Sequence, residues 1–145
     1  MNQDYEPSIR RASQADTTAI KALYRQLSPD DSNLDRDIPA ILSHPDYLCL
    51  IMETGGRAIG MGITCIRTTL SNGRHMVLDE LIIDREFRRR GCGRRLVEHC
   101  IDLARAEGLD SVEVACSLQK TQLHRFYESA GFKHRFRLYS LLLRD

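Results

Sequence analysis

The sequence lacks the long apolar run that a membrane-spanning helix requires. No stretch of its 145 residues approaches the ~20 consecutive apolar residues of such a helix. Its amino terminus, Met-Asn-Gln-Asp-Tyr-Glu-Pro, also lacks the basic and apolar regions of a secretory signal peptide. We therefore expect a cytoplasmic protein with no membrane partner. Repeats, low-complexity tracts and linkers are absent too, so the length predicts a single domain, residues 1–145.

The cysteines and histidines lack the spacings of disulfide frameworks and metal sites. The five cysteines are odd in number and include no Cys-x-x-Cys pair, which predicts free, mostly buried thiols. The five histidines show no metal-ligand spacing, so we expect no metal. Only Cys92 lies in a candidate functional turn. No histidine or acid at a diagnostic spacing marks a base for its thiol, so we expect the backbone around it to matter.

Positive charge is scarce overall but concentrated in one stretch. The formal net charge is +1, yet residues 85–95 carry six arginines against one glutamate, a local charge of +5. A strand-like run, residues 76–83, leads into this stretch, and a run with apolar residues at helical spacing, residues 96–106, leads out of it. Arg94 and Arg95 oppose the dipole at the start of that helix. Their repulsion by the helix dipole destabilises the folded chain, and a bound polyanion would turn this repulsion into a net attraction.

Gly91 and Gly93 predict a sharp turn at the start of the helix. There the amides of the first turn lack intrahelical partners, and the helix dipole attracts anions. Consecutive amides in such a turn form an anion-binding nest. The strand, glycine turn and helix therefore favour a phosphate site over a solvated basic loop. Two familiar phosphate loops do not fit, since no Gly-x4-Gly-Lys-Ser/Thr occurs and Leu96 stands where the dinucleotide fingerprint has its third glycine.

Two motifs resemble those of the GNAT superfamily of N-acetyltransferases. Residues 88–93, Arg-Arg-Arg-Gly-Cys-Gly, follow a strand and resemble the family's acetyl-CoA signature, Arg/Gln-x-x-Gly-x-Gly/Ala. Residues 126–132, Phe-Tyr-Glu-Ser-Ala-Gly-Phe, resemble its downstream pattern FYExxGF. The resemblance covers nearly the whole chain and is strongest from Met76 to Phe132. It implies an enzyme that uses acetyl-CoA as cosubstrate and moves the acetyl group directly to an acceptor amine, on a small molecule or a protein.

The order of predicted elements defines the fold class. An antiparallel meander is followed by a β-α-β crossover, which makes a parallel strand pair. We expect an α/β (α+β) fold with a mixed, mostly antiparallel sheet and helices on both faces. The resemblance adds that the parallel strands splay apart to admit the pantetheine arm. The predicted strands are residues 8–12, 47–53, 58–70, 75–84, 111–116 and 132–143, the last range as one or two strands. The predicted helices are residues 13–28, 36–43, 96–106 and 121–130.

The resemblance implies roles for the cofactor-binding residues. Backbone groups of Leu81, Ile82 and Ile83 would bind the pantetheine arm and the thioester, while the same residues fill ordinary strand core. The next residues would bind the pyrophosphate through amides and guanidinium groups: Arg88, Arg89, Arg90, Gly91, Cys92, Gly93 and Arg94. Lys120 stands where many family members carry an asparagine that touches the cofactor, which leaves that contact open.

Three residues are candidates for proton transfer. Tyr127 is the candidate general acid, because a phenol with a pKa near ~10 stays protonated at neutral pH and can donate to a thiolate. The alternative is an aromatic ring that packs on the sheet. Asp79 and Glu80 interrupt an apolar strand, and adjacent strand residues normally face opposite sides. We favour Glu80 as the base because several GNAT enzymes place an acid on this strand. Asp79, a water relay or a structural ion pair are the alternatives.

Two segments are expected to choose the acceptor. Residues 28–45 include an acidic stretch, 30–37, that would favour a cationic amine or would simply be a solvated loop, and residues 71–75 form a hairpin turn. The resemblance also implies a homodimer, formed through the apolar C-terminal strand.

Two rival functions use the same turn. One is a nucleic-acid-binding module built on residues 85–95. The near-neutral total charge and the absence of interleaved aromatics beyond Phe87 argue against it, so we expect no nucleic-acid partner. The other is a CoA-binding regulator without catalysis, against which the intact Tyr127 argues.

Overall fold

The structure is a computed structural model that describes residues 6–30 and 32–144. The chain forms two compact units, residues 1–114 and residues 115–145. The length predicts that these units belong to a single domain. That expectation stays a prediction. No helix in the described ranges is both long and apolar enough to cross a membrane.

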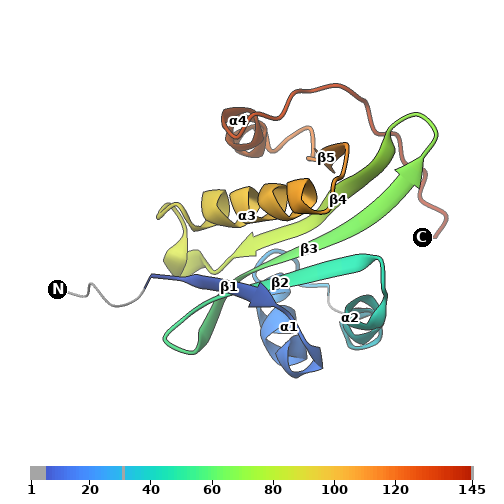
Figure 1. The fold of residues 1–145 in the computed structure, drawn as a ribbon. Coiled ribbons are helices and arrows are strands. Elements are labelled where there is room, and N and C mark those ends of the chain that lie inside the picture. The colour runs from blue at the N-terminus through green and yellow to red at the C-terminus, as the bar shows by residue number, and fades with distance from the viewer. Residues whose placement is uncertain (1–5, 31, 145) are drawn as a thin grey trace. The chain divides into compact units, whose positions relative to one another are not determined.

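A five-stranded sheet forms the first unit (Figure 1). Its strands lie in sequence order, and the first three pairs are antiparallel, whereas β4 and β5 are parallel. The predicted fold class is therefore confirmed. The strands are β1 (Ser8–Arg11), β2 (Tyr47–Thr54), β3 (Arg57–Thr69), β4 (Gly73–Ile83) and β5 (Ser111–Val114).

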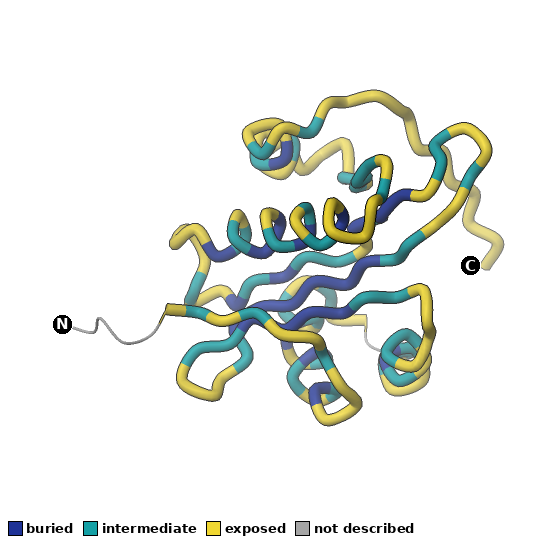
Figure 2. The backbone as a smooth tube through the Cα atoms, viewed as in Figure 1, coloured by how far each residue is buried: buried dark blue, intermediate teal, exposed yellow. Residues whose placement is uncertain are grey.

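Helices cover both faces of this sheet, as the sequence predicts. α1 (Thr17–Arg25) and α2 (Leu34–Ser43) lie on one face, here the α1/α2 face, and α3 (Cys92–Ala106) lies on the other, the α3 face (Figure 1). Burial on both sides explains why β2 is an almost continuous apolar run, with Cys49 to Met52 all buried. Figure 2 shows buried residues along the inner strands and the sheet-facing side of α3.

Side-chain alternation sorts the core between the two faces. On the α3 face, Gly62 of β3 lies beneath Leu96, since a Cβ at position 62 would be in ordinary van der Waals contact with the Leu96 side chain at 3.7 Å. Leu96 and Val97 of α3 are both 0% exposed. The α1/α2 face holds one continuous cluster of buried side chains: Ile20, Leu23, Ile38, Cys49, Ile51, Met61, Ile63 and Ile82.

The first helix starts where the sequence predicts. The Ser13 N–H donates to the Asp16 carboxylate at 2.8 Å, one half of a capping box, and a 3-10 turn η1 (Gln14–Asp16) leads into α1. The Arg10 guanidinium donates to both oxygens of Asp16, at 2.9 and 2.8 Å, and lowers the pKa of that carboxyl. This fork ties β1 to the start of α1.

The second unit contains α4 (Thr121–Ser129) followed by an irregular segment. Gly131 adopts φ 99° and ends α4, as the sequence predicts. The strand predicted over residues 132–143 is wrong, because residues 132–144 form neither helix nor strand. Apolar alternation gives a strand propensity only, and a strand needs a neighbouring edge for its backbone and a surface for its side chains. Here Leu138 is 77% exposed and Leu143 is 92% exposed.

Candidate active site

The cationic turn joins the end of β4 to the start of α3. A short 3-10 helix η2 (Arg85–Phe87) follows β4, and Gly91 then adopts φ 80° as the N-cap of α3. The first intrahelical hydrogen bond runs from the Arg95 N–H to the Gly91 carbonyl at 3.1 Å. The amides of residues 92–94 therefore precede the ladder and point out of the helix end, where its dipole favours an anion. The helix end therefore has the geometry that the sequence predicts for this turn, and its binding of an anion stays a prediction.

The arginines of this turn differ in how they are held. Arg88 donates to the Ile83 carbonyl at 2.9 Å, and Arg94 pairs with Glu98 one turn along α3 at 3.0 Å. The Arg90 guanidinium lies 5.3 Å from the centre of the Phe87 ring. Arg95 instead donates to the Pro7 carbonyl at 2.9 Å, so its charge is directed toward the start of β1. The exposed arginines of the turn are Arg85, Arg88, Arg89, Arg90 and Arg94, whereas Arg95 is half-buried.

The backbone of the turn carries strain at one residue. Arg89 adopts φ 61°, the left-handed region, where a side chain with a Cβ costs roughly 1–2 kcal/mol. Cys92 is 6% exposed, so its side chain packs inward. The expected role of its backbone in cofactor binding stays a prediction.

Asp84 anchors the turn to α1, a contact that the sequence did not predict. Its carboxylate accepts from the Glu86 N–H at 2.9 Å and from the Gln26 amide at 3.1 Å, and the Arg57 guanidinium lies at 3.3 Å. Burial raises the pKa of this carboxyl, but those donors outweigh burial, so its pKa is lowered. The Gln26 side-chain oxygen accepts in turn from the Arg85 N–H at 3.0 Å. No local pattern could pair residues so far apart in sequence.

A β-bulge in β4 changes how the two candidate bases are presented. Ile63 of β3 lies opposite Glu80, and the next residue, Thr64, lies opposite Leu78, so Asp79 has no partner in the register. The strict alternation expected for Asp79 and Glu80 does not hold at this point, since an extra residue in one strand breaks it. Glu80, opposite buried Ile63, belongs to the α1/α2 face.

The charge of Asp79 acts on the same face. The pKa of Cys49, a member of the core cluster on that face, is raised to about 11, chiefly by burial; Arg11 opposes the rise and Asp79 contributes to it. Burial and then Asp79 also raise the pKa of Cys65. The Asp79 carboxyl itself has its pKa raised by desolvation, which Arg67 opposes. The bulge therefore groups Asp79 and Glu80 on one face, whereas the sequence assigned them to opposite faces.

The parallel pairing ends where the bulge begins. β4 pairs with β5 from His75 to Leu78 only, while its pairing with β3 continues to Ile83. Within the sheet of the first unit, residues 79–83 thus have a strand partner on one edge alone. Leu81, Ile82 and Ile83 lie in this half-paired segment. Ile82 is 2% exposed and belongs to the α1/α2 core. Its side chain is therefore an ordinary core residue of the strand, which leaves its backbone as the part that could bind the cofactor.

Tyr127 lies in α4 of the second unit and is 7% exposed. Its ring contacts Phe126 and Phe132 edge to face, with ring centres 5.0 and 5.4 Å away. The aromatic residues of the second motif thus pack on one another. Lys120 is exposed at the N-cap of α4.

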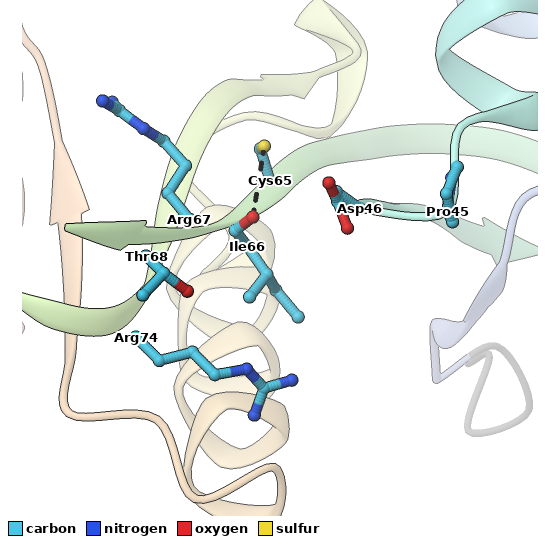
Figure 3. Close-up of a pocket in the computed structure, with 7 residues that line it drawn as sticks. All are labelled: Pro45, Asp46, Cys65, Ile66, Arg67, Thr68 and Arg74. Carbon is cyan, nitrogen blue, oxygen red and sulfur yellow. Dashed lines mark hydrogen bonds between the residues drawn. The ribbon is translucent and has the colours of Figure 1, made fainter.

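A cavity of about 520 Å³ opens at the end of β3 (Figure 3). It borders both segments expected to choose the acceptor, since Pro45 and Arg74 contribute to its wall. The other lining residues are Asp46, Cys65, Ile66, Arg67 and Thr68. In the described ranges, no three His, Cys, Asp or Glu side chains converge to hold a metal ion, and the absence of a metal stays a prediction.

A family model described as "Acetyltransferase (GNAT) family" matches residues 10–132, which include both the cationic turn and the second motif. The chain belongs to this family. The recognition made from the two motifs is therefore confirmed.

Curated GNAT relatives match parts of the chain. The N-acetyltransferase YhdJ of Bacillus subtilis is 33% identical over 67 residues, which are 46% of this chain and 47% of that protein. N-acetyltransferase family 8 member 3 of Rattus norvegicus is 26% identical over 67% of this chain and 43% of its own length. The chain thus spans about half the length of these two relatives. Glucosamine 6-phosphate N-acetyltransferase of Arabidopsis thaliana is 28% identical over 74% of each chain.

Solved structures share the GNAT fold at low identity. A protein described as a transcriptional regulator from Bacillus halodurans is superimposed with a TM-score of 0.86 at 19% identity, over 95% of this chain and 100% of that one. The aminoglycoside N-acetyltransferase AAC(6')-Iy in complex with CoA gives a TM-score of 0.85 at 22% identity, over 100% and 99%. These likenesses establish the fold.

Proposed function

We propose that this GNAT protein transfers an acetyl group from acetyl-CoA to an acceptor amine. The observation that carries the proposal is the cationic turn after β4, where Gly91 is the N-cap of α3 and exposed arginines flank the helix end. The site residues fit the group. The amides of residues 92–94 would hold the pyrophosphate, and Arg88, Arg89, Arg90 and Arg94 would add positive charge.

Positioning is the first contribution of the chain. Acetyl-CoA supplies the acetyl thioester, and β4 would align it through the half-paired backbone of Leu81, Ile82 and Ile83. A well-oriented pair of reactants gains about 7–11 kcal/mol over a bimolecular encounter. The Ile83 carbonyl is already held by Arg88, which fixes the position of the turn against the strand end.

Proton transfer is the second contribution. The acceptor nitrogen attacks the thioester carbonyl, its C–N bond forms and the C–S bond breaks. An amine of pKa ~10 is only about 0.1% neutral at pH 7, so a base is needed. We propose that Glu80 takes the amine proton, directly or through water, with Asp79 as the alternative on the same face. The Tyr127 phenol would donate the proton that the leaving thiolate requires.

A thermal melt tests the cofactor. Acetyl-CoA at about 100 times its dissociation constant should add about 2.7 kcal/mol to the free energy of unfolding, a shift of several degrees for a domain of this size. A short DNA duplex at the same ionic strength is the control. Amine-dependent release of the CoA thiol then tests transfer. No shift with acetyl-CoA, together with a salt-sensitive shift with DNA, would overturn the proposal in favour of the nucleic-acid-binding module.

We further propose that the exposed apolar residues of the C-terminal segment pack against a second copy of the chain. They are Phe136, Leu138, Tyr139, Leu141, Leu142 and Leu143, each at least 64% exposed. Apolar surface of this extent typically marks an interaction site. A dimer in analytical ultracentrifugation that Leu142→Lys dissociates is expected, and a monomer at all concentrations would contradict it. The cytoplasmic location stays a prediction.

A further inference from the structure

The cavity at the end of β3 is lined by an arginine, Arg67, that pairs with no carboxylate of the described residues. Within the described residues, the Arg67 guanidinium makes no hydrogen bond and no ion pair, and the residue is exposed. Arg74, which lines the same cavity, donates to the Glu107 carbonyl at 3.2 Å and lies 3.8 Å from the Glu107 carboxylate. Both residues line the cavity, but their side chains leave opposite faces of the sheet, because Arg74 pairs with Thr68 and lies on the Ile66 side, whereas Arg67 leaves on the other side (Figure 3). Of the two, Arg67 is the one available to a ligand.

Arg67 lies on the same face of β3 as the bulge carboxylates. Alternation places residues 63, 65 and 67 on one face, and in Figure 3 the side chains of Cys65 and Arg67 leave the strand on the side opposite to Ile66. Ile63 pairs with Glu80, Cys65 pairs with Val77, and Arg67 pairs with His75. The face therefore presents two carboxylates at the bulge and a guanidinium farther along the strands.

The spacing suits a small acceptor. About four strand residues at ~3.3 Å each separate the Arg67 register position from Asp79, and the long arginine side chain spans part of that distance. The guanidinium is near enough to lower the pKa of Asp79 without forming an ion pair with it. Cys65, which also lines the cavity, lies between Arg67 and Ile63 on this face of β3.

We propose that Arg67 binds a carboxylate or phosphate group of the acceptor, so that the acetylated substrate carries an anionic group close to its amine. This inference rests on the proposed function, because it places the amine at Asp79 and Glu80. The cationic end of the acceptor would meet the bulge carboxylates and the anionic end would meet the guanidinium, which forms two parallel hydrogen bonds with either kind of oxyanion.

Paired acceptors test the inference with the full chain at saturating acetyl-CoA. One pair is phenylalanine and its amide, and the other is glucosamine 6-phosphate and glucosamine, each followed by release of the CoA thiol. In at least one pair the anionic member should have a kcat/KM roughly ten- to a hundredfold higher, the range of a charge-assisted hydrogen bond. The pair with the larger ratio distinguishes carboxylate from phosphate.

Three variants identify the residue responsible. Arg67→Gln should remove most of the preference, Arg67→Lys should restore part of it, and Arg74→Gln should retain it because Glu107 already holds that arginine. Equal rates within both pairs for the unmodified protein, or a preference that survives Arg67→Gln, would overturn the inference.

The failure of this inference is distinguishable from failure of the proposed function. A protein that binds acetyl-CoA and acetylates amines without preferring the anionic members retains the proposed function and loses this inference. If no compound in the panel is acetylated, the same pairs are compared as stabilisers in thermal melts with CoA present. Equal stabilisation by both members of each pair then overturns the role of Arg67, whereas stabilisation by an anionic member that Arg67→Gln abolishes supports it.

Discussion

Arg89 makes two contributions to the cationic turn that a pair of glycine substitutions can separate. Its side chain adds positive charge, and its backbone adopts φ 61° at a cost in folding free energy. Arg94, in the first turn of α3, adds the same charge from helical backbone. Arg89→Gly and Arg94→Gly therefore remove the same charge from positions of opposite backbone preference.

The structure gives opposite signs for the two changes in stability. At Arg89, glycine relieves a left-handed strain of about 1–2 kcal/mol in the folded state. Glycine also raises the conformational entropy of the unfolded chain, which lowers the free energy of unfolding by about 0.4–1 kcal/mol. At Arg94, glycine costs about 0.8–1 kcal/mol of helix propensity. It also removes the pair with Glu98, worth about 0.3–0.5 kcal/mol. Relief of the repulsion between Arg94 and the helix dipole, about 0.3–1 kcal/mol, offsets part of this loss.

The assay is urea unfolding of both variants without ligand. Arg89→Gly should be about 1–2 kcal/mol more stable than Arg94→Gly, and Arg89→Lys, which keeps both charge and strain, should match the unmodified protein. Titration with acetyl-CoA should show weaker binding in both glycine variants, because each removes one guanidinium. If Arg89→Gly is as unstable as Arg94→Gly, the left-handed conformation at Arg89 is refuted as a source of strain.

Four further predictions follow from named contacts. Asp16→Asn should lower the unfolding free energy by about 1.5–3 kcal/mol at pH 7, because it breaks the fork with Arg10. The folded-state pKa of Asp16 is lowered, so this stabilisation is complete above the ordinary carboxyl pKa of ~4 and is lost as pH falls below it; a difference that persists at low pH in urea melts would contradict this. Tyr127→Phe should lower kcat with acetyl-CoA affinity nearly intact, and equal turnover across the pH range would remove it as the acid. Gly93→Glu should abolish acetyl-CoA binding by placing a carboxylate at the phosphate position, and micromolar binding by calorimetry would refute that assignment. Glu80→Gln should shift the acid limb of the rate profile, and an unchanged limb would leave Asp79 or water as the base.

The bulge at Asp79 shows where sequence reasoning reached its limit. The alternation of β4 is a local property, and it assigns Asp79 and Glu80 to opposite faces. The extra residue appears only when β4 is paired with β3, because a bulge is a mismatch in register between two strands. The same limit applies to Asp84, since its donor Gln26, the C-cap of α1, is far from it in the sequence.

The C-terminal segment shows a second kind of limit. Its apolar residues predict a strand. A strand forms only when its backbone hydrogen-bonds to the edge of a sheet, and nothing in residues 132–143 specifies which sheet edge that would be. Leu141 and Leu142 are consequently exposed in a segment whose propensity is for a sheet.

The sequence alone determined the elements up to α4, their order and the residues of the turn, whereas the strand that it predicts over residues 132–143 does not form. Apolar periodicity is read within each segment, and Gly91 and Gly93 between arginines require a turn that exposes amides to an anion. Tertiary structure alone decided which side chains share a face. It grouped Asp79, Glu80 and Arg67 across two strands and drew Arg95 away to Pro7. Register and packing are set by contacts between residues far apart in the chain, and local propensity carries no information about such contacts.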